Sequence, residues 1–212
     1  MARLSRTEQV NRNRSLLLDA ARRVFLARGY HGATLEQIAD EAGFSKGVVY
    51  SRFESKADLF LALLEDRIEE RAAENARFAE SLTNGGGLPS LLEHLIRGDQ
   101  ATPGWLLLVI EFRVHAARDA ALTRRYAAVH ARTVDALAGV IATITAQDGA
   151  EPAVPPRQLA ELLLALSSGV TLEQAARPDA LGGRQLAAHL ARVLQPITRP
   201  PTPGLPARSA RR

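Results

Sequence analysis

The 212-residue chain is predicted to be all-α. Apolar residues recur at helical spacing through most of it, and no stretch shows the alternation of apolar and polar residues that marks a strand. Helix-start signals precede several of these patterns. We expect a flexible basic arm at 1–12, a three-helix domain at 13–58, a larger helical domain at 59–195 and a disordered Pro/Arg-rich tail at 196–212.

The N-terminal domain begins with two helices whose ends are marked by local signals. Apolar spacing predicts a first helix at 12–28 that ends at Gly29. Thr34 and Gln37 form a capping box that can satisfy the free amides at the start of a second helix. Gly43 stands where that helix needs a residue tolerant of the left-handed conformation.

A third helix follows so closely that the pair predicts a helix-turn-helix. Ser45, two residues after Gly43, can cap this helix. Helices joined this tightly cross steeply, and the second one enters the DNA major groove with its N-terminal residues toward the base edges. The residues predicted to face the groove are Ser45, Lys46, Gly47 and Val48.

Gly47 needs an explanation, because glycine inside a helix costs about 1 kcal/mol relative to alanine. A close approach to DNA and close packing of the two helices are both open. Tyr50 could be a core aromatic, but Phe53 is the better core candidate. That assignment leaves Tyr50 free to direct its hydroxyl to a phosphate.

A fourth helix is predicted to start near residue 56 and to run to the glycine-rich loop at 84–87. Ser55 and Asp58 form its capping box, and Lys56 lies in its first turn, where a helix N-terminus favours a phosphate. An ordinary capped helix with a solvated lysine is the alternative. Lys46 and Lys56 are, however, the only lysines among 27 basic residues, and they flank the third helix.

Residues 13–64 resemble the DNA-binding domain of the TetR family of bacterial transcriptional regulators. The resemblance rests on the segments FLARGYHGAT, TLEQIADEAG and FSKGVVYSRFESKADLF. It implies that Thr34 caps its helix near a phosphate. The further residues implied to contact the DNA backbone or bases are Tyr50, Ser51, Arg52 and Lys56. Val48 is apolar where many relatives have a polar reader. A contact with a thymine methyl would be possible in place of a donated hydrogen bond, and the base preference stays open.

The rest of the chain also reads as helices. They are predicted at 89–97, 104–117, 119–146, 157–176 and 179–194. The segment 104–117 is apolar nearly all round, which predicts burial on most faces.

The resemblance implies a small-molecule effector site in the larger domain. An apolar cavity with a few polar groups suits such a ligand. The candidate lining residues fall at helical spacing on two successive helices: Trp105, Leu108, Phe112, His115, Tyr126 and His130. A packed core with two satisfied histidines is the alternative.

The last two helices are predicted to form a homodimer interface. A two-fold protein that reads a palindromic operator has a geometric reason to place a self-complementary surface far from its DNA readers. The candidate interface residues are Leu159, Leu162, Leu163, Leu166, Gly169, Leu186 and Leu190. An internal packing face is the alternative.

Composition excludes several classes of function. The absence of cysteine removes disulfides, thiol catalysis and cysteine-bound zinc. The N-terminus does not have the pattern of a secretory signal, and the most apolar stretch, 105–110, is too short to cross a bilayer. We therefore expect a cytoplasmic protein that is not an enzyme and has no catalytic residues, cofactor, metal site or membrane partner.

Positive charge concentrates at the two ends of the chain. Residues 1–60 carry ten basic and seven acidic side chains, whereas residues 61–195 carry thirteen and sixteen. Residues 196–212 add four arginines and no acids. This distribution suits nucleic acid at the N-terminal domain and disfavours it across the middle.

The predicted function is ligand-responsive regulation of transcription. We expect a repressor that binds a palindromic DNA operator as a homodimer and is released by a small-molecule effector, with a tilt of the fourth helix carrying the signal. One alternative is a helical metal-binding protein or enzyme that uses Glu111 and His115, one turn apart, with His94 and His130 in the same domain. Another is a DNA-binding protein without an effector.

Overall fold

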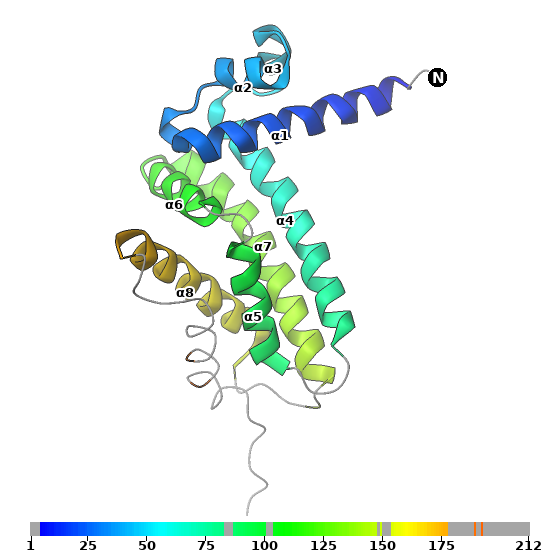
Figure 1. The fold of residues 1–212 in the computed structure, drawn as a ribbon, viewed down its shortest axis with the longest axis vertical. Helices are drawn as coiled ribbons and strands as arrows, with labels where there is room; N and C mark the ends of the chain where they lie inside the picture. Colours follow the sequence, from blue (N-terminus) through cyan, green and yellow to red (C-terminus); the bar gives the residue numbers. More distant parts are fainter. Residues whose placement is uncertain are drawn as a thin grey trace, which may run out of the picture.

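The computed structural model describes residues 5–82, 87–100, 104–147, 149, 154–177, 189 and 192. These residues form eight α-helices and no strand, which confirms the all-α class (Figure 1). The helices are α1 (Arg6–Gly32), α2 (Leu35–Ala42), α3 (Lys46–Tyr50), α4 (Lys56–Ser81), α5 (Gly87–Gln100), α6 (Trp105–Ala116), α7 (Ala120–Gln147) and α8 (Pro156–Ala176). The predicted helix at 179–194, apart from residues 189 and 192, and the tail at 196–212 lie outside the described residues.

Helix α1 begins six residues earlier than the apolar pattern indicated. Ser5 and Glu8 form a capping box, in which the Glu8 amide donates to Ser5 Oγ at 3.2 Å and the Ser5 amide to Glu8 Oε2 at 2.7 Å. Residues 6–12, expected in a flexible arm, therefore extend the helix. Gly29, at φ 69° and ψ 172°, breaks the helical geometry where the helix was predicted to end, and one further turn follows it.

The predicted signals at both ends of α2 are present in the structure. The Gln37 amide donates to Thr34 Oγ1 at 3.2 Å, and the Thr34 amide donates to Gln37 Oε1 at 3.1 Å. Gly43 adopts the left-handed conformation at φ 70°, and its amide donates to the carbonyls of Ala39 and Asp40. These local bonds end α2 sharply, so that α3 starts at once in a new direction (Figure 1).

An aromatic cluster joins the first helices to the rest of the bundle. Phe25 of α1, Phe60 of α4 and Phe112 of α6 are fully buried, and ring centroids lie 5.2 Å apart for Phe25 and Phe60 and 4.3 Å apart for Phe60 and Phe112. Tyr30 packs on all three rings. Helices α1 to α4 thus share one continuous core with α6 rather than forming an isolated unit.

A second core fills the far half of the bundle, between α4, α5, α7 and α8. Leu91, Ile141 and Ile144 are almost completely buried there. Leu159 and Leu163, expected at the dimer interface, belong to this core and are 0% and 4% exposed. The prediction for these two residues was wrong because their side of α8 faces α7 within the subunit.

Helix α7 is long and apolar enough to span a membrane by length and composition, and no other helix of the described residues meets that test. It packs along α4 and α8 and contributes buried residues to both cores. About one third (33%) of its most apolar window is buried inside the structure.

Candidate DNA-binding surface and effector cavity

The N-terminal turn of α3 is an accessible surface at the end of the molecule. Ser45 occupies the N-cap position with extended backbone, but its hydroxyl makes no capping bond, contrary to the prediction. The Val48 amide instead donates to the Ser45 carbonyl at 3.0 Å. Ser45, Lys46 and Gly47 are exposed and Val48 is half-buried, while Val49 anchors the helix in the core. Four predicted readers therefore lie on one exposed turn.

Gly47 has no packing reason within the described chain. A Cβ added to it would have a single neighbour within 4 Å, the Ser45 hydroxyl at 3.9 Å, which is an ordinary van der Waals contact and not a clash. Close approach of α2 and α3 therefore does not require a glycine at this position. Of the two explanations offered for Gly47, close packing between the helices is therefore excluded, and a close approach to DNA is left.

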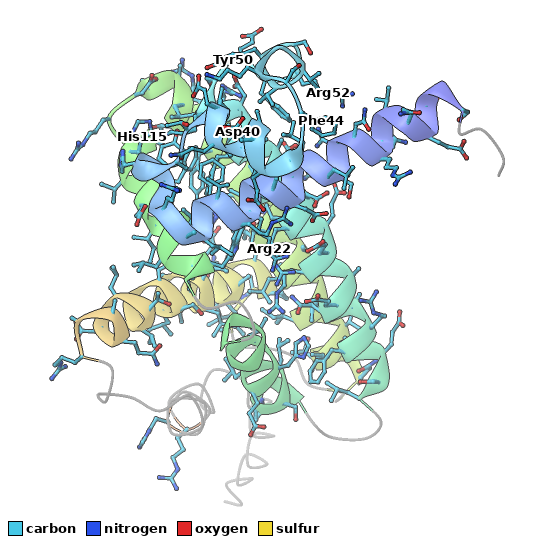
Figure 2. All side chains as sticks on the ribbon, turned by 45° about the horizontal axis from the view of Figure 1, so that its top comes forward. Arg22, Asp40, Phe44, Tyr50, Arg52 and His115 are labelled. Carbon is cyan, nitrogen blue, oxygen red and sulfur yellow. The ribbon has the colours of Figure 1, made fainter. Side chains whose placement is uncertain are left out.

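Tyr50 is exposed, as predicted, and Phe53 is buried. Tyr50 is 49% exposed and lies at the end of the molecule that α2 and α3 form (Figure 2). Its hydroxyl donates to Glu36 Oε1 of α2 at 2.8 Å. This bond raises the pKa of Tyr50 and lowers the pKa of Glu36. The hydroxyl expected to reach a phosphate is thus held by a carboxylate that shares the exposed surface.

Ser51 and Arg52 close α3 and tie it to its neighbours. The Ser51 hydroxyl donates to the Val48 carbonyl at 2.9 Å, within its own helix. Arg52, labelled in Figure 2, donates from Nη1 to the Val10 carbonyl of α1 at 3.4 Å. The extra turns of α1 thus lie next to the end of α3.

Lys56 has a structural role that the sequence did not indicate. Its ammonium donates to the carbonyl oxygens of Ala33 at 2.8 Å and His31 at 3.2 Å, and lies 4.7 Å from the Tyr30 ring centroid. Burial lowers the pKa of Lys56. The last carbonyls of α1 lack helical partners because the helix ends at Gly32, and the lysine satisfies those of His31 and Ala33. Its side chain is therefore committed to these carbonyls rather than turned to a phosphate.

A cavity of about 180 Å³ lies between α4, α6, α7 and α8, with α5 at its edge. Trp105, Tyr126 and His130, three of the six predicted effector residues, line it. Most of the other lining residues are apolar, and the polar ones come from four helices. The apolar lining residues include Leu64, Ile68, Ala72, Leu95, Leu106, Val109, Leu137 and Leu164. The polar lining residues include Asn75, Thr133, Ser167 and Ser168.

Leu108, Phe112 and His115 do not line this cavity, and their assignment was wrong. Leu108 and Phe112 are 3% and 0% exposed in the first core, and His115 packs on rings of α1. The adjacent stripe of α6, with Val109 and Arg113, faces the cavity. A helix that is apolar nearly all round does not indicate which stripe faces which neighbour.

Three arginines also line the cavity, and the sequence reasoning missed them. Arg67 Nη1 lies 2.9 Å from Glu70 Oε2, and Arg71 Nη1 lies 2.9 Å from Glu74 Oε2. Arg113 donates from Nη1 to the Ser168 hydroxyl at 3.3 Å. Arg67 and Arg71 stand in the acid- and arginine-rich part of α4, a pattern typical of a solvated face.

The second face of α6 contacts the end of α1. Glu111 Oε2 accepts a hydrogen bond from the Tyr30 amide at 2.8 Å, just after the kink at Gly29. The His115 ring centroid lies 4.9 Å from that of Tyr30 and 5.3 Å from that of His31. Burial, and then the nearby His31, lower the pKa of His115.

Glu111 and His115 therefore form a junction between α6 and α1. Figure 2 shows His115 beside α6, away from Tyr50 and Arg52. The pair had motivated the metal-protein alternative, and its contacts with Tyr30 and His31 account for it instead. His94, also part of that alternative, bonds Asn75 Oδ1 at 3.0 Å. The part of the chain that the structure describes has no group of three His, Asp or Glu residues placed to hold a metal ion.

A helix-turn-helix fused to a larger helical domain defines a DNA-binding transcriptional regulator. Two family models match the chain: residues 17–63 match the bacterial regulatory proteins of the tetR family, and residues 87–199 match the C-terminal domain of BetI-type transcriptional repressors. The chain belongs to the TetR family of transcriptional regulators.

Known relatives agree with this assignment. The transcriptional activator FasR of Mycolicibacterium smegmatis is 48% identical over 67 residues, which cover 32% of this chain and 29% of FasR. FadR of Bacillus subtilis in complex with stearoyl-CoA has a TM-score of 0.65 at 15% identity, covering 85% of this chain and 96% of FadR. A Saccharomonospora viridis regulator in complex with choline has a TM-score of 0.67 at 21% identity, covering 89% and 98%. At these identities the structural likeness concerns the fold.

Proposed function

We propose that the protein is a repressor that binds a palindromic operator as a homodimer and leaves it when a small molecule enters the cavity. The observation that carries the DNA-binding part is the exposed first turn of α3, where Lys46 is accessible and Gly47 has no packing reason. The match to BetI-type repressors supports the direction of regulation.

In this proposal α2 supports α3, and α3 contacts the DNA. Val49 and the buried face of α2 hold α3 against the core, which leaves its first turn free to enter a major groove. Lys46 and Val48 are the base-reading candidates, and Gly47 lets the helix backbone approach the DNA. Tyr50 lies at the edge of this surface, where a phosphate would compete with Glu36 for its hydroxyl.

The proposed dimer surface centres on the outer face of α8. Leu162 and Leu172 are 42% and 49% exposed, Leu166 is half-buried, and a Cβ added to Gly169 would meet nothing within 4 Å. Leu186 and Leu190 lie outside the described residues. Light scattering on eluted protein should give twice the 22.9 kDa subunit mass at micromolar concentration, and a monomer mass throughout would contradict the dimer.

The proposed signal has two structural routes from the cavity to the DNA-binding helices. Helix α4 begins directly after the helix-turn-helix and carries Arg67 and Arg71 into the cavity wall. Helix α6 lines the cavity through Val109 and holds α1 through Glu111. A ligand that binds one arrangement of these helices better by about 1–3 kcal/mol would change operator occupancy usefully.

Loss of Lys46 tests the DNA-binding surface. A duplex selected by the wild-type protein from a random-sequence library serves as the probe, read by fluorescence anisotropy at fixed salt. Lys46→Ala should weaken binding roughly tenfold, the loss expected for one base-reading contact. Arg77→Ala, which removes one exposed positive charge near the far end of α4, is the matched control and should bind like wild type. If Lys46→Ala binds the duplex as tightly as Arg77→Ala and the wild-type protein, the assignment of α3 as the DNA-reading helix is overturned.

Activation is a second candidate for the direction of regulation, because FasR is an activator. The selected duplex, placed upstream of or across a promoter in a reconstituted transcription reaction, distinguishes the two. The proposal expects less transcript when the protein is added, and more transcript would assign activation.

A further inference from the structure

We propose that the cavity binds an anionic amphiphile, namely an organic acid whose carboxylate pairs with Arg113 and whose apolar part lies against Trp105 and Val109. This inference rests on the proposed function, since it names the chemical class of the effector. It follows from the charges of the cavity wall, the unsatisfied Arg67 Nε and the size of the cavity.

The ionic residues of the cavity wall are all basic. Arg67, Arg71 and Arg113 line it, and no Asp or Glu is among the lining residues that the structure describes. Glu70 and Glu74 pair with Arg67 and Arg71. No carboxylate of the described residues pairs with Arg113, whose partners are a hydroxyl at 3.3 Å and the Tyr126 ring, 5.9 Å from Cζ.

A guanidinium in this position favours a carboxylate ligand. Arginine stays charged at all relevant pH values, and its planar fork fits a carboxylate with two parallel hydrogen bonds. Arg113 is half-buried on α6, and Ser167 on α8 also lines the cavity and offers a hydroxyl donor. The Ser168 hydroxyl already donates to the Leu164 carbonyl at 2.9 Å. The carboxylate of a ligand would supply the counter-charge that the described protein residues do not provide.

Arg67 adds a second observation that points to a ligand. Its side chain is 12% exposed, and its Nε is buried without a hydrogen-bond partner in the described structure. A buried unsatisfied donor is unfavourable, so a polar ligand group or its bound water would relieve it. His130 offers another polar group: burial, and then Arg113, lower its pKa, so its neutral ring can donate or accept.

The size and lining of the cavity restrict the rest of the ligand. A volume of about 180 Å³ has room for on the order of ten water-sized groups. Leu64, Ile68 and Leu137 make much of the wall apolar. A medium-length alkyl or single-ring acid satisfies both limits. Choline, the ligand of the S. viridis regulator, is a cation that Arg113, which has no carboxylate partner among the described residues, would repel.

Trp105 provides a direct readout, because it lines the cavity and is the only tryptophan of the chain. Octanoate, its uncharged isostere octanamide, and choline are titrated into full-length protein while tryptophan fluorescence is recorded. We expect a saturable change with octanoate, at least tenfold weaker binding of octanamide, and none of choline. Octanamide or choline binding as tightly as octanoate would overturn the proposal, as would no response to octanoate, decanoate or benzoate.

A charge-neutral variant assigns the effect to one residue. Arg113→Gln should weaken octanoate at least tenfold and leave octanamide within a factor of about two, whereas Arg124→Gln, an exposed arginine of α7 outside the cavity, should change neither. Unchanged octanoate binding in Arg113→Gln would refute the pairing. If that variant does not fold, the octanoate and octanamide comparison on wild type decides the ligand class.

The affinity of the wild-type protein for its selected duplex, measured with and without octanoate, separates this inference from the proposed function. Octanoate binding with unchanged DNA affinity supports the ligand class and contradicts its role as effector. A cation or neutral ligand that both binds at Trp105 and releases DNA supports the regulated function and overturns the anionic class.

Discussion

Replacing Gly29 with alanine should destabilise the protein at the junction between α1 and α6. Gly29 has φ 69° and ψ 172°, a conformation that is essentially restricted to glycine. An added Cβ would also lie 2.9 Å from Glu111 Oε2, the oxygen that accepts the Tyr30 amide. The substitution therefore strains the backbone and displaces the carboxylate that holds α6 to α1.

The expected loss of stability in Gly29→Ala follows from these two effects. Backbone strain of this kind costs about 1–3 kcal/mol. The Glu111 carboxylate ends a flexible side chain and can move, which weakens a partly exposed charged hydrogen bond by about 1 kcal/mol. A total of about 2–4 kcal/mol corresponds to a fall in melting temperature of about 5–15 °C for a chain of this length.

Gly32→Ala is the matched control, three residues further along the same helix. An added Cβ at Gly32 would meet the Arg28 Cβ at 3.6 Å, an ordinary contact, and Gly32 does not have a positive φ. Thermal unfolding followed by circular dichroism should place Gly32→Ala within a few degrees of wild type. A melting temperature of Gly29→Ala equal to that of Gly32→Ala would refute the account of this junction.

Three further changes test other parts of the structure. Thr34→Ala removes the cap that receives the Gln37 amide and should lower the free energy of unfolding in urea by about 1 kcal/mol; no loss would contradict the cap. Glu111→Gln should weaken the contact with the Tyr30 amide and reduce the effect of a ligand on DNA affinity, measured by anisotropy; an unchanged effect would contradict the α6 route. Burial lowers the pKa of His115, so stability should fall as pH drops below 6.5, because the unfolded chain then binds the proton more readily. Denaturant unfolding at several pH values should show a smaller fall for His115→Gln, and equal slopes would contradict this.

The helix-turn-helix was predictable because its signals are local. The Thr34 capping box and the left-handed Gly43 depend on neighbours within a few residues, and both are present in the structure. The capping box of Ser5 and Glu8 is equally local, so the early start of α1 could have been predicted from the sequence. Apolar spacing alone does not indicate this start, because the first turns of α1 are mostly polar and exposed.

The cavity was only partly predictable because its lining depends on how helices are rotated against one another. Helix α6 is apolar on nearly every side, so Phe112 and Val109 could not be assigned to different neighbours from sequence. Arg67 looked solvated because it stands among acids, yet it reaches the cavity wall. Leu159 met the pattern of an interface, but tertiary packing placed it against α7. Long-range contacts of this kind are not encoded in residue spacing.

The most direct test of the central claim, that the first turn of α3 reads DNA, is the affinity of Gly47→Ala for the selected duplex. The added Cβ meets no protein atom closer than 3.9 Å, so folding should be unharmed and helix propensity should raise stability by up to about 1 kcal/mol. Gly139→Ala, at a helix position of α7 with nothing within 4 Å, is the control for that gain. The account predicts that Gly47→Ala is at least as stable as wild type and binds DNA roughly tenfold more weakly, while Gly139→Ala binds normally. Wild-type affinity of a folded Gly47→Ala protein would contradict it.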